Sequence, residues 1–183
     1  HFKKYKISWI EQPFLKERHN KTVAQFTQRD IPLMADESLC NFDDAKEIIE
    51  KKYFDLFNIR ISKNGGLYNS LKLAELAKKN NLGYQLGAQV GETAILSNIG
   101  AILACHFKPI ALEGSAGTFL LKQDISEENV RFKMDGLAKK FEGPKNFGLT
   151  LKKNFLNIII LLPVIIILGG LRDTMMSKKQ ETE

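Results

Sequence analysis

Five polar side chains follow five short apolar segments of the chain at nearly equal intervals. The steps between them are 25, 27, 26 and 24 residues. Carboxylate groups in such a set could hold a hard cation such as Mg²⁺, which prefers oxygen ligands. A lysine close to that cation would be pushed toward its neutral form, because like charges repel, and a neutral amine can accept a proton. The five residues are Glu11, Asp36, Lys63, Gln89 and Glu113.

Strand-like and helical patterns alternate along the chain and explain the regular spacing. Apolar runs of strand length predict five β-strands, at 6–13, 31–38, 57–62, 83–89 and 109–114. Amphipathic or apolar runs predict three helices between them, at 41–53, 67–83 and 92–107. Strands that alternate with helices over short connections indicate right-handed βαβ units and a parallel sheet.

The length of the repeat favours a barrel. One strand plus one helix in about 25 residues is the unit of a (β/α) barrel, in which the carboxyl ends of all strands surround one pocket. The five polar side chains would therefore converge. An open, doubly wound sheet is the alternative fold, but it is expected to carry a glycine fingerprint of the GxGxxG type, which the sequence lacks.

The helical segments carry local signals of their own. Asn41 is expected to cap the first helix, which has acidic residues in its first turn and lysines in its last. The third helix is apolar around most of its circumference and is expected to be well buried. The second is expected to stop at the sequence NNLG and to bury a stripe of four residues, Leu67, Leu71, Ala74 and Ala77.

Each strand-end residue also has a purely structural explanation. A single carboxylate at the end of a strand usually caps a turn, and Lys63 followed by Gly65 and Gly66 is ordinary turn chemistry. Several such residues around one rim favour a functional site. A metal, carboxylates and a lysine together suit the removal of a proton α to a carboxylate, with the metal stabilising the enediolate. As a rim side chain, Lys63 is expected to add little to folding.

Four motifs, WIEQP, PLMADESL, NIRISKNGGL and QLGAQVGETAILS, together resemble the enolase superfamily, specifically its mandelate racemase/muconate lactonizing enzyme branch. The resemblance runs from about residue 6 to about residue 151. It implies an α/β fold, the C-terminal part of a modified TIM-type (β/α)₇β barrel, with the predicted strands as the fourth to the eighth. It also implies that the protein acts with Mg²⁺ on a small carboxylate substrate, as a racemase or epimerase, a cycloisomerase or a dehydratase.

The same resemblance implies roles for individual residues. Glu11 and Asp36 would be Mg²⁺ ligands, and Glu37 the second acid of the Asp-Glu pair that accompanies the site. Lys63 would be the sixth-strand general acid/base. Glu113 looks like the eighth-strand glutamate that steadies the substrate carboxylate or the enolate.

Three further residues are expected to bind substrate. Glu92 lies in the seventh-strand motif beside Gln89, and Gly65 would let the substrate approach the amine closely. Dipeptide epimerases of this branch are expected to carry Asp-x-Asp on the eighth strand, where this chain has LEGSAG. By the resemblance the complete enzyme is expected to be a homo-oligomer.

Some family features are missing from this chain. The family has an aspartate on the third strand as a further metal ligand, a Lys-x-Lys motif on the second strand, and an N-terminal capping domain. Residues 1–155 therefore look like part of the barrel domain of a longer enzyme. The alternative is a non-catalytic fragment, or a membrane-tethered interaction module, that keeps the barrel sequence without its chemistry.

Composition narrows the remaining possibilities. The chain is 44% apolar and 26% charged, as globular proteins are. Its net charge of +6 comes from lysines spread along the sequence, so no nucleic-acid partner is expected. Cys40 and Cys105 stand alone, which favours a reducing, cytoplasmic location. The three histidines are scattered and indicate no histidine-based metal site.

The C-terminal end of the sequence has a different character. Residues 156–171 are almost wholly apolar and are followed by a polar tail at 172–183. As a helix, this run would be about 24 Å long, short of the roughly 30 Å of a bilayer core. Pro163 in its middle suits a membrane helix better than a soluble one. A membrane segment, a buried strand and a reading-frame artefact remain open.

Overall fold

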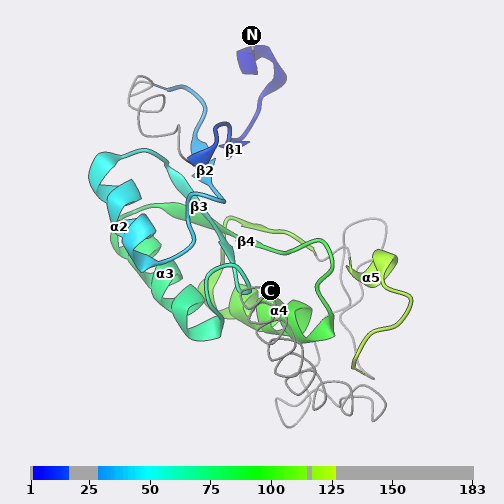
Figure 1. The fold of residues 1–183 in the computed structure, drawn as a ribbon. Coiled ribbons are helices and arrows are strands. Elements are labelled where there is room, and N and C mark those ends of the chain that lie inside the picture. The colour runs from blue at the N-terminus through cyan, green and yellow to red at the C-terminus, as the bar shows by residue number, and fades with distance from the viewer. Residues whose placement is uncertain (1, 17–28, 115–116, 127–183) are drawn as a thin grey trace, which may run out of the picture.

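The computed structural model describes residues 2–16, 29–114 and 117–126 (Figure 1). The apolar segment 156–171 and the tail 172–183 lie outside these residues. Within residues 2–16, 29–114 and 117–126, no helix is long and apolar enough to cross a membrane. The elements in order are η1 (Phe2–Tyr5), β1 (Ile10–Glu11), β2 (Leu33–Ala35), α2 (Phe42–Lys51), β3 (Leu56–Arg60), α3 (Leu67–Lys79), β4 (Gly83–Gly87), α4 (Ala94–Phe107), β5 (Ala111–Leu112) and α5 (Gly117–Leu120).

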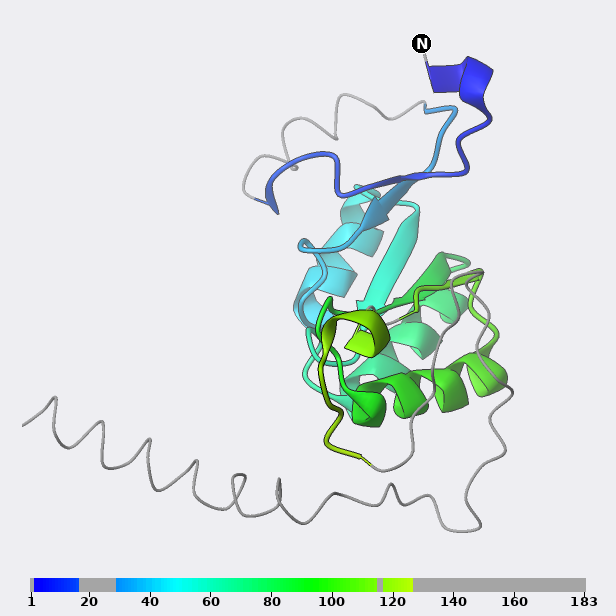
Figure 2. The same cartoon turned by 90° about the vertical axis from the view of Figure 1, so that its right-hand side faces the viewer.

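The five strands form one parallel sheet in the order β1-β2-β3-β4-β5. Each strand pairs with the next along the chain, so the strand order never reverses as it would in a doubly wound sheet. The strands curl, and α2, α3 and α4 follow them on one side (Figures 1 and 2). This confirms the predicted partial (β/α) barrel.

The central strands are longer than the outer ones. β3 and β4 pair over five positions, from Leu56 with Gly83 to Arg60 with Gly87. β1 and β5 have two residues each, fewer than predicted. Within the described sheet each of them has a single neighbouring strand, β2 for β1 and β4 for β5. Fewer backbone hydrogen bonds therefore keep the ends of β1 and β5 in strand conformation.

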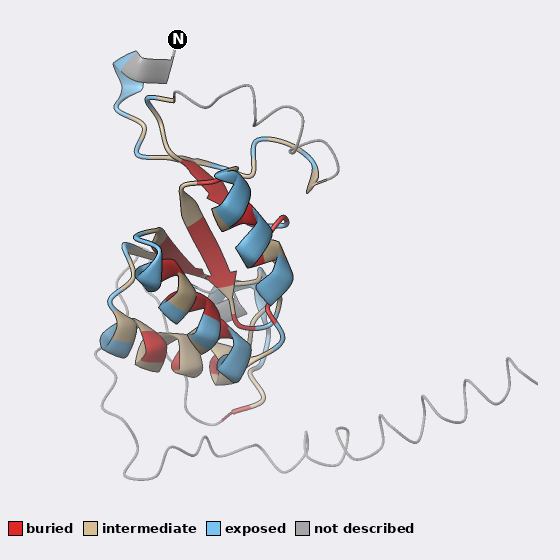
Figure 3. Ribbon diagram, turned by 90° about the vertical axis from the view of Figure 1, so that its left-hand side faces the viewer, coloured by how far each residue is buried: buried red, intermediate tan, exposed pale blue. Residues whose placement is uncertain are grey.

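The core lies between the sheet and the helices, and buried residues line the faces that meet there (Figure 3). Phe57 and Ile59 of β3 belong to the same buried cluster as Leu73 and Ala77 of α3. The intervening residue, Asn58, is fully buried without belonging to that cluster. β3 therefore presents an apolar face to the helices and a polar face to the inside of the barrel.

Two of the helix predictions need correction. In α3 the buried residues are Ser70, Leu73, Ala74 and Ala77. The predicted stripe is wrong at Leu67, which is 43% exposed because it starts the helix before the turn that packs on the sheet. In α4 only Ala94, Asn98 and Leu103 are buried. Most of the other α4 residues are half-buried, since the described sheet covers only one side of that helix.

The cap predicted for α2 is confirmed. The side chain of Asn41 accepts hydrogen bonds from the backbone nitrogens of Asp43 and Asp44, each at 2.9 Å. The carboxylate of Asp44 accepts in return from the backbone nitrogen of Asn41, at 3.3 Å. This reciprocal pair satisfies donors that would otherwise be left open at the start of the helix.

Candidate active site

All five strand-end residues lie at or just past the carboxyl ends of their strands. Glu11 is the last residue of β1, Asp36 follows β2 directly and Glu113 follows β5 directly. Lys63 lies in the turn after β3, and Gln89 lies in the loop after β4. The parallel order of the strands places these ends on one rim, as the spacing predicted.

Asp36 is the centre of the contacts at this rim. Its side chain is only 4% exposed. One carboxylate oxygen, Oδ1, lies 2.6 Å from Nζ of Lys63. The other, Oδ2, accepts a hydrogen bond from Nη2 of Arg60. Both oxygens of this buried carboxylate are therefore bound by cations of the same chain, which offsets much of the cost of burying its charge.

Lys63 is bound more tightly than a surface lysine. Besides Oδ1 of Asp36, its Nζ donates to the backbone oxygens of Asp36 at 2.7 Å and of Asn58 at 2.9 Å. An ammonium group has three hydrogens, and all three are used. Burial lowers the pKa of Lys63, while its hydrogen bond to Asp36 and the charge of that carboxylate oppose the shift. The side chain of Lys63 is only 10% exposed and joins the ends of β2 and β3, so these contacts favour a contribution to folding that its place on the rim did not predict.

Glu11 approaches the same place from β1. Its Oε1 accepts hydrogen bonds from Nδ2 of Asn58 at 2.6 Å and from Nη2 of Arg60 at 3.4 Å. Partial burial raises the pKa of Glu11, the hydrogen bond from Asn58 opposes that change, and the charge of Asp36 adds to it. Glu11 and Asp36 thus face each other across a single guanidinium nitrogen.

Arg60 and Asn58 are site residues that the sequence interpretation missed. Arg60 binds both carboxylates, and its Nη1 lies 3.5 Å from Oε1 of Gln89. In the sequence they alternate with Phe57 and Ile59, a pattern that indicates a strand but assigns no function to its polar residues. The available signal was their position in the middle of a parallel sheet, where strands are usually apolar on both faces. Polar residues on such a strand indicate the lining of a site.

Gln12 was also missed, and it fixes the backbone next to both carboxylates. Its Oε1 accepts hydrogen bonds from the backbone nitrogens of Asp36 at 2.9 Å and Ser38 at 3.2 Å. Its Nε2 donates to Oγ of Ser38 at 2.9 Å and to the backbone oxygen of Phe14 at 2.7 Å. One side chain therefore ties the loop after β1 to the loop after β2.

Other predicted residues lie away from this centre. Glu37 is exposed, and no hydrogen bond of its carboxylate occurs among the described residues. Glu92 closes the loop after β4, because its Oε1 accepts from the backbone nitrogen of Gln89 at 2.9 Å and from Oγ of Ser62 at 3.3 Å. Gly65 has a φ of +80°, a left-handed conformation that favours glycine whether or not a substrate lies beside it.

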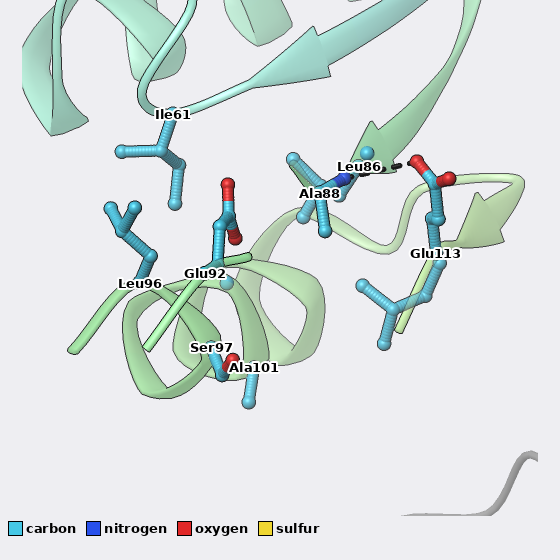
Figure 4. Close-up of a pocket in the computed structure, with 11 residues that line it drawn as sticks. Ile61, Leu86, Ala88, Glu92, Leu96, Ser97, Ala101 and Glu113 are labelled. Carbon is cyan, nitrogen blue, oxygen red and sulfur yellow. Dashed lines mark hydrogen bonds between the residues drawn. The ribbon is translucent and has the colours of Figure 1, made fainter. Parts of the chain in front are cut away.

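A pocket lies beside this centre, between the ends of β4 and β5 and the start of α4 (Figure 4). Its cavity volume is only about 30 Å³, and Ile61, Leu86 and Leu96 give it apolar walls. Glu92 and Glu113 also line it. The carboxylate of Glu113 accepts a hydrogen bond from the backbone nitrogen of Ala88 at 3.0 Å. Of the three predicted substrate residues, Glu92 lines this pocket, whereas Gln89 contacts Arg60 and Gly65 lies in the turn after β3.

The donor chemistry of the rim fits Mg²⁺. Oxygens of Glu11 and Asp36 both contact one positively charged nitrogen, so they already converge on a point that holds a cation. Carboxylates of this kind are usual Mg²⁺ ligands, and the remaining positions are commonly filled by water and substrate oxygens. Within the described residues no group of three or more His, Cys, Asp or Glu side chains surrounds a common point. Further ligands would have to come from elsewhere.

Comparison with known proteins identifies the family. A family profile described as enolase C-terminal domain-like matches residues 1–145. The chain belongs to this family. Its relatives come from the mandelate racemase/muconate lactonizing branch of the enolase superfamily, which confirms the resemblance of the four motifs.

The enolase C-terminal domain-like chain is similar to racemases and epimerases. The N-succinyl-L-Arg/Lys racemase of Bacillus cereus is 32% identical over 119 residues, which are 65% of this chain and 32% of that protein. Its crystal structure matches with a TM-score of 0.69 at 26% identity, covering 85% of this chain and 41% of the other. The dipeptide epimerase of Enterococcus faecalis, solved with Mg and the dipeptide L-Leu-L-Tyr, matches with a TM-score of 0.64 at 28% identity, covering 70% and 36%.

The similarities cover only part of each relative. The chain spans about one third of the length of the curated relatives that it matches. The roles of individual residues, the homo-oligomer, the cytoplasmic location and the lack of a nucleic-acid partner are not tested by them and stay predictions.

Proposed function

We propose that the polypeptide containing this chain removes and returns the proton α to the carboxylate of a small substrate, with Mg²⁺ held by Glu11 and Asp36. The observation that carries this proposal is the convergence of the two carboxylates on one cation-binding point at the strand ends. Bound Mg²⁺ would stabilise the negative charge that develops on the substrate carboxylate as the proton leaves.

Neighbouring side chains would hold the two ligands in place. Asn58 donates to Glu11, and Gln12 accepts from the backbone nitrogen of Asp36. The first contact orients the carboxylate of Glu11 and the second holds the backbone that carries Asp36, which is the usual task of residues behind a metal site. Glu37, next to Asp36, would contribute negative charge at the rim.

Lys63 is the residue that we propose for proton transfer. It can accept a proton only as a neutral amine, and burial lowers its pKa in that direction. Its three hydrogens are engaged in this structure, so Nζ must leave Asp36 before it can act. Arg60 cannot take the same role, because a guanidinium stays protonated.

The substrate is proposed to be an amino acid acylated on its nitrogen. Two of the similar proteins are named for N-succinyl amino acids and for dipeptides, and both classes share that chemistry. The segment LEGSAG lacks the Asp-x-Asp expected of dipeptide epimerases, which favours the N-succinyl amino acids. The apolar walls of the pocket beside the rim would contact only a small part of the substrate. Gln89, Glu92, Glu113 and Gly65 are the residues proposed to contact it.

A second candidate is a barrel segment that has lost its chemistry. One observation favours it: both oxygens of Asp36 are bound by side chains of the chain itself. A site saturated in this way would not bind a metal ion or transfer protons.

Proton exchange with solvent distinguishes the two candidates. The complete gene product that contains this chain is incubated with Mg²⁺ in D₂O, with N-succinyl-L-lysine or L-Leu-L-Tyr, and the α-proton signal is followed by NMR. We expect the signal to disappear and the opposite stereoisomer to form. Glu11→Gln keeps the size of the side chain and removes its charge, so Mg²⁺ binding should weaken and exchange should fall with it. No exchange in the wild type with either substrate would support the second candidate.

A further inference from the structure

Helix α4 begins without a cap from its own sequence. Thr93 precedes the helix in the extended conformation of an N-cap residue, with a φ of −83° and a ψ of 174°. Within the described residues its side chain makes no capping hydrogen bond, and the first turn of α4 carries no acidic residue. The first backbone N–H groups of a helix have no partner inside the helix, and this end carries a partial positive charge. The start of α4 therefore needs an acceptor from another part of the chain.

Asp124 supplies this acceptor from a position 30 residues further along the chain. Its Oδ2 accepts a hydrogen bond from the backbone nitrogen of Ala94, the first residue of α4, at 2.9 Å. Its Oδ1 accepts from the backbone nitrogen of Ser126 at 3.1 Å. Ala94 and Ser126 are both buried. One carboxylate thus joins the start of α4 to the segment that follows α5.

This contact lies at the end of α4 that lines the pocket beside the rim. Leu96 of α4 forms part of one wall, and Glu113 at the end of β5 lines the pocket from the sheet (Figure 4). Glu92, which precedes the helix, lines it as well and holds the backbone nitrogen of Gln89 at 2.9 Å. Because the cavity measures only about 30 Å³, a small shift of α4 would change what it admits.

We propose that Asp124 is a positioning residue of the candidate site: its carboxylate fixes the start of α4, and with it Glu92, relative to Glu113. This inference rests on the proposed function, because that function assigns Glu92 and the pocket to substrate binding. An ordinary cap stabilises the helix to which it is bound, and a residue within that helix can replace it. A contact from a distant segment also fixes where the helix lies, which no cap within α4 can do.

A double-mutant cycle in the complete gene product separates these two roles. Asp124→Ala removes both hydrogen bonds of the carboxylate. Thr93→Asp supplies a local cap, because aspartate at an N-cap accepts from N–H groups of the first turn. The effect of Asp124→Ala is measured with and without this local cap. The readout is amide hydrogen exchange, followed by mass spectrometry, in the peptide that contains Gln89, whose N–H is held by Glu92.

We expect Asp124→Ala to speed exchange in this peptide by roughly 2- to 30-fold, the factor that corresponds to the loss of a typical helix cap. The increase should persist when Thr93→Asp is present in both proteins, because the local cap does not hold α4 to the segment after α5. An increase that disappears in the presence of Thr93→Asp would make Asp124 an ordinary cap and overturn the proposal. No increase in either background would overturn it as well.

Asp43→Ala is the matched control for loss of a carboxylate at the start of a helix. Asp43 lies in the first turn of α2, its side chain is 90% exposed, and it pairs with Lys46 at 3.0 Å. Its substitution changes the net charge by the same amount and should leave exchange at Gln89 unchanged. An equal increase in both variants would show a general effect of lost charge and contradict the proposal.

Substrate binding provides a second measurement. The exchange of the α-proton of N-succinyl-L-lysine is followed by NMR at a series of substrate concentrations. We expect Asp124→Ala to raise KM by roughly the same 2- to 30-fold and to change kcat much less, because Asp124 positions the pocket and not the groups proposed for proton transfer. Equal KM values in the wild type and Asp124→Ala would overturn the proposal. If the wild type exchanges no α-proton, the proposed function is wrong, and the amide-exchange cycle alone decides whether Asp124 positions α4.

Discussion

Asn58 of β3 donates a hydrogen bond to Glu11 of β1 at 2.6 Å, across the strand that separates them in the sheet. Strands two positions apart lie about 9.5 Å from each other, so the two side chains must lean toward one another over β2. Such a contact suits the concave inner face of a curled sheet. It places a neutral donor against a carboxylate that also contacts Arg60.

The first prediction concerns this contact. Asn58→Leu keeps the size of the side chain but removes the amide that binds Glu11. We expect the free energy of unfolding to fall by about 1–3 kcal/mol, because Glu11 loses its shortest hydrogen bond in a half-buried place. Urea denaturation measures the change. Asn69→Leu is the control: Asn69 is exposed on α3, and its substitution should change stability by less than about 0.5 kcal/mol. Equal costs at both positions would contradict the prediction.

The second prediction concerns Lys63. Lys63→Met leaves Asp36 buried with one cation in place of two and removes one donor from the backbone oxygens of Asp36 and Asn58. Removal of one partner from a buried ion pair typically costs about 3–5 kcal/mol, and we expect a loss of that order. The measurement is again urea denaturation.

A surface lysine provides the comparison for Lys63. Lys46→Met removes a pair with Asp43 at 3.0 Å, in which both side chains are largely exposed. Exposed pairs contribute about 0–1 kcal/mol, so this variant should remain close to the wild type. If Lys63→Met is as stable as Lys46→Met, the three hydrogen bonds of Lys63 do not stabilise the fold.

The positions of the strand-end residues were predictable from the sequence, and their contacts were not. Glu11 and Asp36 follow apolar runs at a regular interval, and in a parallel sheet the interval alone determines that they share a rim. Which side chains touch there depends on rotamers and reach. Arg60 lies within its strand, yet its long side chain extends to both carboxylates. Lys63 lies beyond the strand and turns back toward Asp36.

Burial also separates the predicted features from those that were missed. Asn58 is polar and fully buried. The alternation of a strand does not indicate that its polar residues are buried, whereas the inside of a barrel is polar where a site is formed. The N-cap at Asn41 was predictable, since a cap depends on its immediate neighbours. Leu67 was assigned to the wrong environment because the stripe of a helix shows which residues align, but not where the sheet begins to cover them.

The third prediction concerns pH. The hydroxyl of Tyr84 donates to the backbone oxygen of Phe107 at 2.8 Å, and burial raises the pKa of Tyr84 above its ordinary value of 10.0. The folded protein therefore binds this proton more tightly than the unfolded chain does. The stability that comes from neutral Tyr84 is fully present below pH 10.0 and is lost as the pH rises through the raised value in the folded state.

Comparison with Tyr84→Phe isolates this contribution from the titration of the lysines. At neutral pH the variant should be about 1 kcal/mol less stable, because it lacks the hydrogen bond to Phe107. The difference between the two proteins should shrink as the pH rises above 10.0. Denaturation at a series of pH values measures it, and a difference that stays constant or grows would argue against the assignment.

The last prediction concerns the space that β4 leaves for the two interior side chains of β3. A Cβ atom at Gly87 would clash with Oδ1 of Asn58 and lie 2.9 Å from Cγ of Arg60. Both neighbours are held by carboxylates, so neither can move away without loss of a hydrogen bond. Gly87→Ala is therefore expected to destabilise the protein by about 1–3 kcal/mol, as overpacking of a filled interior usually does.

Gly100→Ala is the matched control, because Gly100 lies within α4 and a Cβ there meets nothing within 4 Å. Alanine is favoured over glycine in a helix by about 1 kcal/mol, so this second variant should be as stable as the wild type or more stable. Urea denaturation of both variants compares the same chemical change in two surroundings. Two variants of equal stability would show that the polar face of β3 is loosely packed, and that Gly87 is not needed to position Arg60.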